Sequence, residues 1–154
     1  MGVDKIFSKQ EIESLRKLIL AFNEITGVEV TFIIEAMGQD VIKVGEVKDL
    51  DVYSLGLLLG GNMASLCGLA KLLSADKFDY VLYEANQRSV YCAYLSDFII
   101  VAVFKNNCIK GKVRYYLNQL AEDVNNIIKT EQNKEIGEQK LNEITQKDID
   151  ELFS

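Results

Sequence analysis

The stretch from residue 55 to residue 70 carries no charged side chain, and this constrains the fold more than any other part of the sequence. With its flanks it predicts a helix over 51–74. Glycine inside a helix costs about 0.5–1 kcal/mol relative to alanine, so glycines at regular intervals need a compensating contact. Because helices pack along rows four residues apart, such a row predicts the close approach of another backbone. The row of small residues in this helix is Gly56, Gly60, Ala64 and Gly68.

The sequence leaves open what this helix packs against. The row of small residues fits either the sheet of the same domain or a second copy of the chain. A transmembrane helix is a third possibility, but Asn62, Ser65 and Lys71 interrupt the apolar run, and no aromatic belt or basic flank follows. A helix that is apolar nearly all round is more simply one buried on two sides in a soluble chain, so we expect no membrane insertion. Its bulky residues form one broad face that consists of Leu55, Leu58, Leu59, Met63, Leu66, Leu69 and Leu73.

Apolar periodicity predicts the remaining elements. Ser8 and Glu11 form a capping box that begins a helix, and Gly27 suits its end. A last helix follows Asn107. The predicted fold is an α/β (α+β) domain with a central five-stranded, mostly antiparallel sheet, flanked by three helices in the order α-β-β-α-β-β-β-α. The predicted strands span residues 28–35, 41–44, 78–83, 90–95 and 98–104, of which the last should be the most buried.

The C-terminal segment 131–154 differs in composition from residues 1–130, which we take as the domain. Residues 131–143 are polar, which predicts an acidic linker or a frayed helix end, and we expect this part to be mobile. Thr145 and Asp148 form a further capping pair and predict a short C-terminal helix. This helix either folds back onto the domain or serves as a docking peptide for a partner's groove. Its apolar residues are Ile149, Leu152 and Phe153.

The composition argues against several classes of function. The formal net charge is −6 and the isoelectric point is about 4.8, which disfavours binding to nucleic acid or to an anionic membrane surface. The chain has no histidine, so it lacks the usual general base and the commonest metal ligand. Cys67, Cys92 and Cys108 have no metal-like spacing, and we interpret them as reduced, packed thiols. Together with the lack of a signal peptide, they predict a cytoplasmic protein without metal or cofactor.

No catalytic motif stands out in the sequence. We find no phosphate-binding loop, no dinucleotide-binding fingerprint and no nucleophile elbow. Asp49 and Asp51 precede the uncharged helix and are better explained as helix caps than as metal ligands. Arg88 on its hairpin turn could act as an arginine finger, although an ordinary solvated turn residue is the simpler interpretation. We therefore expect a protein that is not itself an enzyme.

The order of the predicted elements resembles the roadblock/LC7 family over residues 8–130. Within that family, the bacterial branch paired with gliding-motility GTPases matches best in size and cytosolic character. The similarity depends on the order and spacing of loose motifs rather than on a strict signature. These motifs are Gly27-Val28 with the following strand and the Gly38 turn, the helix end Leu69-Ala70-Lys71-Leu72-Leu73, and Asn107, Gly111, Val113 and Arg114 at the start of the last helix.

The resemblance implies a homodimer joined through the central helix and the third strand. It also implies binding to a small Ras-like GTPase, and stimulation of GTP hydrolysis without insertion of a catalytic residue. Leu57 and Gly61 of the central helix are then candidates for partner binding. Profilin-like and longin-like sensor domains share related architectures, and fold alone does not decide between these functions. The expected dimer interface consists of Gly56, Gly60, Ala64, Gly68, Phe78, Tyr80 and Leu82.

A second resemblance concerns the segment 144–153. It is similar to the short peptide of flagellar switch proteins that binds the chemotaxis response regulator. The shared features are Gln146, an acidic residue at 148, the pair Ile149-Asp150 and the apolar residues Leu152 and Phe153. This likeness implies an alternative function, in which the chain is a non-enzymatic adaptor in motility or chemotaxis that docks a response regulator. Ile149, Leu152 and Phe153 would anchor that partner.

Overall fold

The computed structural model describes residues 7–36 and 40–152, with the backbone alone at 131–150 and 152. Its sheet is antiparallel and five-stranded, in the order β2-β1-β5-β4-β3. This confirms the predicted fold class. The elements are α1 (Lys9–Thr26), β1 (Val30–Glu35), β2 (Asp40–Gly45), α2 (Val52–Gly61), α3 (Met63–Leu72), β3 (Tyr80–Glu84), β4 (Arg88–Tyr94), β5 (Phe98–Lys105) and α4 (Lys110–Leu152).

Helix α1 begins and ends as the sequence predicts. The Ser8 side chain accepts a hydrogen bond from the backbone N–H of Glu11 and donates one to the Glu11 carboxylate. Gly27 ends the helix in the left-handed conformation, with φ at 78°, and its N–H donates to the Asn23 carbonyl. Both ends therefore satisfy backbone groups that a helix leaves unpaired.

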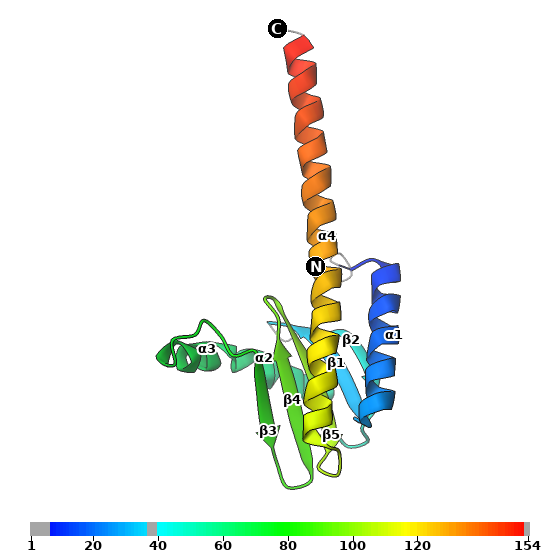
Figure 1. The fold of residues 1–154 in the computed structure, drawn as a ribbon, viewed down its shortest axis with the longest axis vertical. Coiled ribbons are helices and arrows are strands. Elements are labelled where there is room, and N and C mark those ends of the chain that lie inside the picture. The colour runs from blue at the N-terminus through cyan, green and yellow to red at the C-terminus, as the bar shows by residue number, and fades with distance from the viewer. Residues whose placement is uncertain (1–6, 37–39, 153–154) are drawn as a thin grey trace.

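The two faces of the sheet carry separate apolar cores. Helices α1 and α4 cover one face and contact each other, whereas α2 lies on the other face over β1 (Figure 1). The α1/α4 core includes Leu15, Ile19 and Leu117, and the α2 core includes Phe32 and Leu59. Strand β5 is buried on both faces along its length up to Lys105, which confirms that it is the most buried strand.

The central helix is divided where the sequence predicts one helix over 51–74. Helix α2 ends at Gly61 and α3 begins at Met63, with Asn62 between them. Two glycines followed by an asparagine weaken a helix at this point, because all three are poor helix formers. Hydrogen bonds of helical type still flank the junction, from the N–H of Asn62 to Leu58 and from the N–H of Leu66 to Asn62. The two segments therefore keep roughly the same helical faces.

The C-terminal segment differs from the prediction more strongly. Helix α4 is 43 residues long and continues to Leu152 without a break, so the backbone expected to form a linker over 131–143 is helical. The predicted short C-terminal helix is the end of α4. A single glycine, Gly137, costs a helix only about 1 kcal/mol, and the surrounding glutamate, lysine and glutamine residues are good helix formers. Figure 1 shows this part of α4 extending beyond the sheet rather than folding back onto it.

Candidate interaction surface

Helix α2 is fixed at its start by Asp51. The Asp51 carboxylate accepts hydrogen bonds from the backbone N–H of Ser54 at 3.0 Å and from the Ser54 hydroxyl at 2.5 Å. These bonds lower the pKa of Asp51 from its ordinary value. The role of Asp51 as a helix cap is thereby confirmed. Asp49, two residues earlier, has a positive φ of 70° and belongs to the turn that leads into the helix.

The row of small residues does not lie on one face of the molecule. Gly56 and Gly60 are buried within the chain, whereas Ala64 and Gly68 are exposed. Each step of four residues advances about 40° around a helix, because a turn contains 3.6 residues. The row therefore starts against the domain's own sheet and emerges into solvent. Gly56 and Gly60 are already covered by their own domain, which argues against the predicted contact of these two residues with a second copy.

The bulky residues of α2 and α3 also divide between inside and outside. Leu59 is buried, and Leu55, Met63 and Leu66 pack against the α2 core. A second set is exposed on the side near β3, which we call the β3-side face. Asn62 marks that side, because its amide donates to the Tyr83 hydroxyl of β3 at 3.4 Å. The β3-side face consists of Leu58, which is 73% exposed, Asn62, Ser65, Leu69 and Leu73.

The adjacent positions form a second exposed face, which we call the outer face. Leu57 is 43% exposed and Leu72 is 82% exposed. Gly61 and Gly68 lie between them, and a Cβ atom added at either would meet nothing within 4 Å. The outer face is therefore smooth and open at its centre and apolar at both ends. It consists of Leu57, Gly61, Ala64, Gly68 and Leu72.

An open groove of about 560 Å³ runs beside α2 toward β3. Leu58 and Tyr83 line it, and so do Leu57 and Gly61 of the outer face. The two faces thus meet at one groove. The segment Val52–Leu72 is long and apolar enough to cross a membrane by length and composition alone, and 17% of its most apolar 18-residue window is buried within the domain.

Strand β3 lies at an edge of the sheet, as a dimer joined through the third strand requires. It begins at Tyr80 rather than Phe78, so Phe78 lies before the strand, half-buried. Tyr80 and Leu82 are half-buried and pack against the α1/α4 core, whereas Val81 and Tyr83 pack against the α2 core. The free edge of β3 and the β3-side face lie on the same side of the molecule, since Tyr83 connects them through Asn62.

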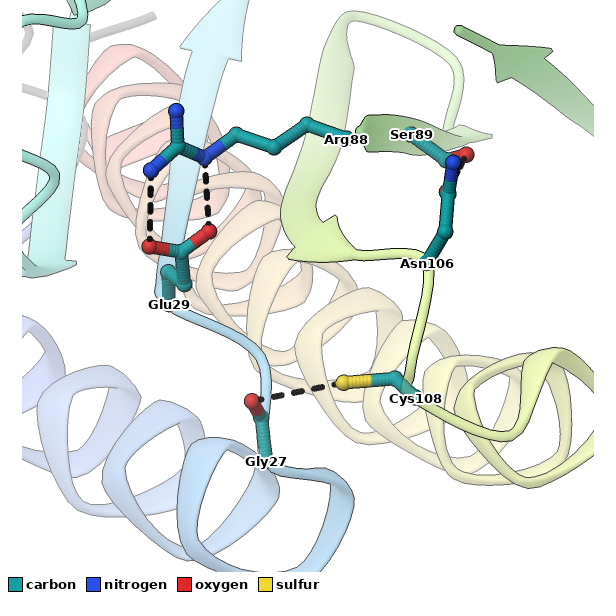
Figure 2. Close-up of polar contacts among 6 residues, drawn as sticks. All are labelled: Gly27, Glu29, Arg88, Ser89, Asn106 and Cys108. Carbon is teal, nitrogen blue, oxygen red and sulfur yellow. Dashed lines mark hydrogen bonds and ion pairs between the residues drawn. The ribbon is translucent and has the colours of Figure 1, made fainter. Parts of the chain in front are cut away.

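Arg88 is the first residue of β4 and forms an ion pair with Glu29, just before β1 (Figure 2). Its Nε donates to one carboxylate oxygen at 2.8 Å, and a terminal nitrogen donates to the other at 3.3 Å. Hydrogen bonding to Arg88 lowers the pKa of Glu29. Nearby, the Ser89 hydroxyl donates to Asn106, and the Cys108 thiol donates to the Gly27 carbonyl. Arg88 is therefore held within the fold, and an arginine finger would first have to break this ion pair.

Other reactive groups in the described part of the chain are inert or scattered. Burial raises the pKa of the Cys92 thiol to about 12, which keeps it protonated at neutral pH. Among the side chains that the structure describes, those of residues 7–36, 40–130 and 151, acidic and cysteine groups form no cluster of three that could hold a metal ion. Of the predicted tail residues, Ile149 and Leu152 lie on the helical backbone of α4, and Phe153 falls outside the described residues.

No protein-family model matches the sequence, and no curated protein sequence matches it significantly. Many solved structures are similar in fold, and three of them are described here. MglB of Myxococcus xanthus is 24% identical, with a TM-score of 0.71, over 76% of this chain and 96% of that one. An MglB with a tetrameric arrangement is 21% identical, with a TM-score of 0.74, over 78% of this chain and 91% of that one.

The third is a roadblock/LC7 domain from Streptomyces avermitilis, 11% identical, with a TM-score of 0.63, over 71% of this chain and 93% of that one. The chain has the roadblock/LC7 fold. At these identities the likeness shows the fold alone.

Within this roadblock/LC7 fold, the sequence did not distinguish Leu58, Leu69 and Leu73 from the inward-facing leucines. Their angular position was the available signal, because Leu69 and Leu73 follow Leu58 by 11 and 15 residues and so return to nearly the same side of the helix.

Proposed function

We propose that this roadblock-fold protein is a dimeric interaction module for a small Ras-like GTPase in the cytoplasm. The observation that carries the proposal is the pair of exposed apolar faces on one helix segment, α2–α3. Soluble proteins rarely leave such contiguous apolar surface open unless a partner covers it. Two adjacent faces provide for two partners at once.

The β3-side face and the free edge of β3 are assigned to a second copy of the chain. An uncovered strand edge tends to pair with another strand, and the exposed Leu58, Leu69 and Leu73 would become buried beside it. The tetrameric arrangement recorded for one MglB with this fold supports self-association as a property of such domains. Phe78, Tyr80 and Leu82 remain in the proposed interface at this edge.

The outer face is assigned to the GTPase. Leu57 and Gly61 were the sequence candidates for this role, and Ala64 and Gly68 share their face rather than the β3-side face. Open glycine positions let a partner's backbone approach closely, and Leu57 and Leu72 supply apolar contacts at either end. The proposed action requires no catalytic side chain of this protein, which agrees with the engagement of Arg88 by Glu29.

A GTP-hydrolysis assay tests this function. The rate of hydrolysis by a Ras-like GTPase from the same genome would be measured with and without this protein. Acceleration supports a GTPase activator. Binding without acceleration supports a scaffold for the GTPase, and the absence of any complex would contradict both.

The alternative is an adaptor whose C-terminal peptide docks a chemotaxis response regulator. The end of α4 extends beyond the sheet (Figure 1). This position supports the alternative, because it leaves the tail available to a partner. Both proposals use the same dimer. They differ in whether α2–α3 or the tail carries the regulated partner.

A further inference from the structure

Three residues of β3 direct their backbone N–H and C=O groups toward the free edge of the sheet. The Asp79 carbonyl accepts from the N–H of Tyr94 at 2.9 Å, and the N–H of Ala85 donates to the Arg88 carbonyl at 3.1 Å. Backbone groups alternate between the two edges of an antiparallel strand. Odd-numbered residues from 79 to 85 therefore point toward β4. Tyr80, Leu82 and Glu84 direct their N–H and C=O groups toward the free edge.

The side chains of the same three residues lie on the α4 side of the sheet. The Tyr80 hydroxyl donates to Asn118 of α4, and the guanidinium carbon of Arg114 lies 6.0 Å from the centre of the Tyr80 ring. Glu84 forms an ion pair with Lys110 at the start of α4. Two cations of α4 thus lie along the β3 edge, one near each end of the strand.

Symmetric antiparallel pairing of two β3 strands restricts the possible registers. If the register shifts by one residue, each residue that directs its backbone groups toward the free edge faces a residue of the other copy that directs its groups toward β4. The two strands then cannot form their ladder of hydrogen bonds. A shift of two residues leaves one of the three outward-pointing residues without a partner in the other strand. Only the register with Leu82 opposite its own counterpart pairs all three, and it places Tyr80 of one copy opposite Glu84 of the other.

We propose that Glu84 of one copy forms an ion pair with Arg114 of the other and that this pair fixes the register of self-association. The inference rests on the proposed dimer and specifies its geometry. Residues directly opposite each other in an antiparallel ladder project to the same side of the sheet, about 4.5–5.5 Å apart. The incoming Glu84 carboxylate therefore arrives beside the Tyr80 ring, next to Arg114.

Charge complementarity supports this pairing over the alternatives. Each Glu84 lies between Lys110 of its own chain and Arg114 of the other, and the two-fold symmetry makes the contact twice. Registers displaced by two residues move the incoming Glu84 away from the Tyr80–Arg114 site. Complementary charges at an interface favour one geometry over others. Here they favour the register with Leu82 opposite its counterpart over the registers displaced by two residues.

The test is a charge swap followed by sedimentation equilibrium of the full chain. Arg114→Glu and Glu84→Arg should each raise the dissociation constant of the dimer about tenfold, because each removes two symmetric ion pairs and introduces repulsion. The double variant restores opposite charges and should recover most of the affinity. Lys112→Glu, an equal charge change at an exposed position of the same helix, is the matched control and should leave the constant unchanged.

The outcomes separate this inference from the function on which it rests. A monomeric unmodified protein overturns the proposed dimer itself. A dimer whose affinity is unaffected by either single change overturns the register but leaves the dimer standing. A double variant whose dimer has a higher dissociation constant than the dimers of both single variants also overturns the register. Circular dichroism should show equal folding of all variants, and if a reversed charge unfolds the chain, Arg114→Gln and Glu84→Gln should give the same effect in weaker form.

Discussion

Arg88 holds Glu29 through two hydrogen bonds across the end of the sheet, and the guanidinium lowers the pKa of that carboxyl below its ordinary value of 4.5. The two residues flank β5, which lies between β1 and β4. The ion pair therefore joins the ends of strands that share no backbone hydrogen bonds. It is only partly buried, with 20% of the Glu29 side chain and 38% of the Arg88 side chain exposed.

This ion pair predicts a pH-dependent contribution to stability. A carboxyl with a lowered folded pKa stabilises the protein above its ordinary pKa, and the stabilisation is lost as the pH falls through the lowered value. Glu29→Gln should therefore reduce the melting temperature at neutral pH, and the difference from the unmodified protein should vanish in acid. Thermal unfolding against pH measures this, with Glu24→Gln, an exposed position on α1, as the control. A deficit that is constant at all pH values would show that the effect is not due to ionisation.

Gly45 should tolerate no side chain. Its φ is +99°, and an added Cβ would collide with the Glu29 carbonyl oxygen. Gly45→Ala should lower the free energy of unfolding by more than about 1 kcal/mol, since a left-handed conformation alone costs an L-residue about that much. Gly111→Ala in α4 is the matched control, because an added Cβ there meets nothing within 4 Å. It should stabilise the protein by about 0.5–1 kcal/mol. Urea unfolding of both variants would contradict this account if they changed stability in the same direction.

Replacement by leucine should have different effects at Gly60 and at Gly68. Gly60 is buried, so Gly60→Leu overpacks the α2 core and should cost about 1–3 kcal/mol of stability. Gly68 is open, so Gly68→Leu should leave the fold intact and weaken binding at the outer face. Melting temperatures together with a binding titration distinguish the two effects. Equal loss of stability in both variants would mean that the row of small residues lies on one buried face after all.

The end of α4 should be dispensable for folding. The part of α4 from residue 145 to Leu152 extends beyond the sheet, so deleting residues 145–154 should leave the melting temperature nearly unchanged while binding of one partner is lost. Replacing the same residues with a scrambled sequence of equal charge controls for helix length. If the segment packs on the domain instead, each buried apolar residue contributes about 1.5–3 kcal/mol, and truncation should lower the melting temperature by many degrees.

Local signals in the sequence were sufficient for much of the fold. The capping box at Ser8, the left-handed Gly27 and the uninterrupted apolar run of β5 each depend on neighbouring residues, and each is found as predicted. The order of elements followed from these signals, and with it the resemblance to the roadblock/LC7 fold. That resemblance implied pairing of two copies through the third strand, and β3 lies at an edge of the sheet.

The candidate surface could be predicted only in part, because it depends on tertiary packing. The sequence shows a row of small residues, but only the packing of α2 over β1 shows that Gly56 and Gly60 belong to the inside and Ala64 and Gly68 to the outside. The backbone at 131–143, where the sequence predicts a linker or a frayed helix end, is helical for a different reason. A polar segment of good helix formers can continue an existing helix at little cost, and polarity alone does not distinguish that from a loop.

Titration of this protein with a GTP-loaded Ras-like GTPase from the same genome tests the central claim most directly. The neighbouring residues Leu57 and Leu58 provide matched variants, because they point to different faces of α2. Calorimetry should show binding to the unmodified protein, and Leu57→Glu should abolish it while the dimer persists in sedimentation. Leu58→Glu should instead weaken the dimer. Failure of the unmodified dimer to bind the GTPase, or binding that survives Leu57→Glu undiminished, would contradict the account.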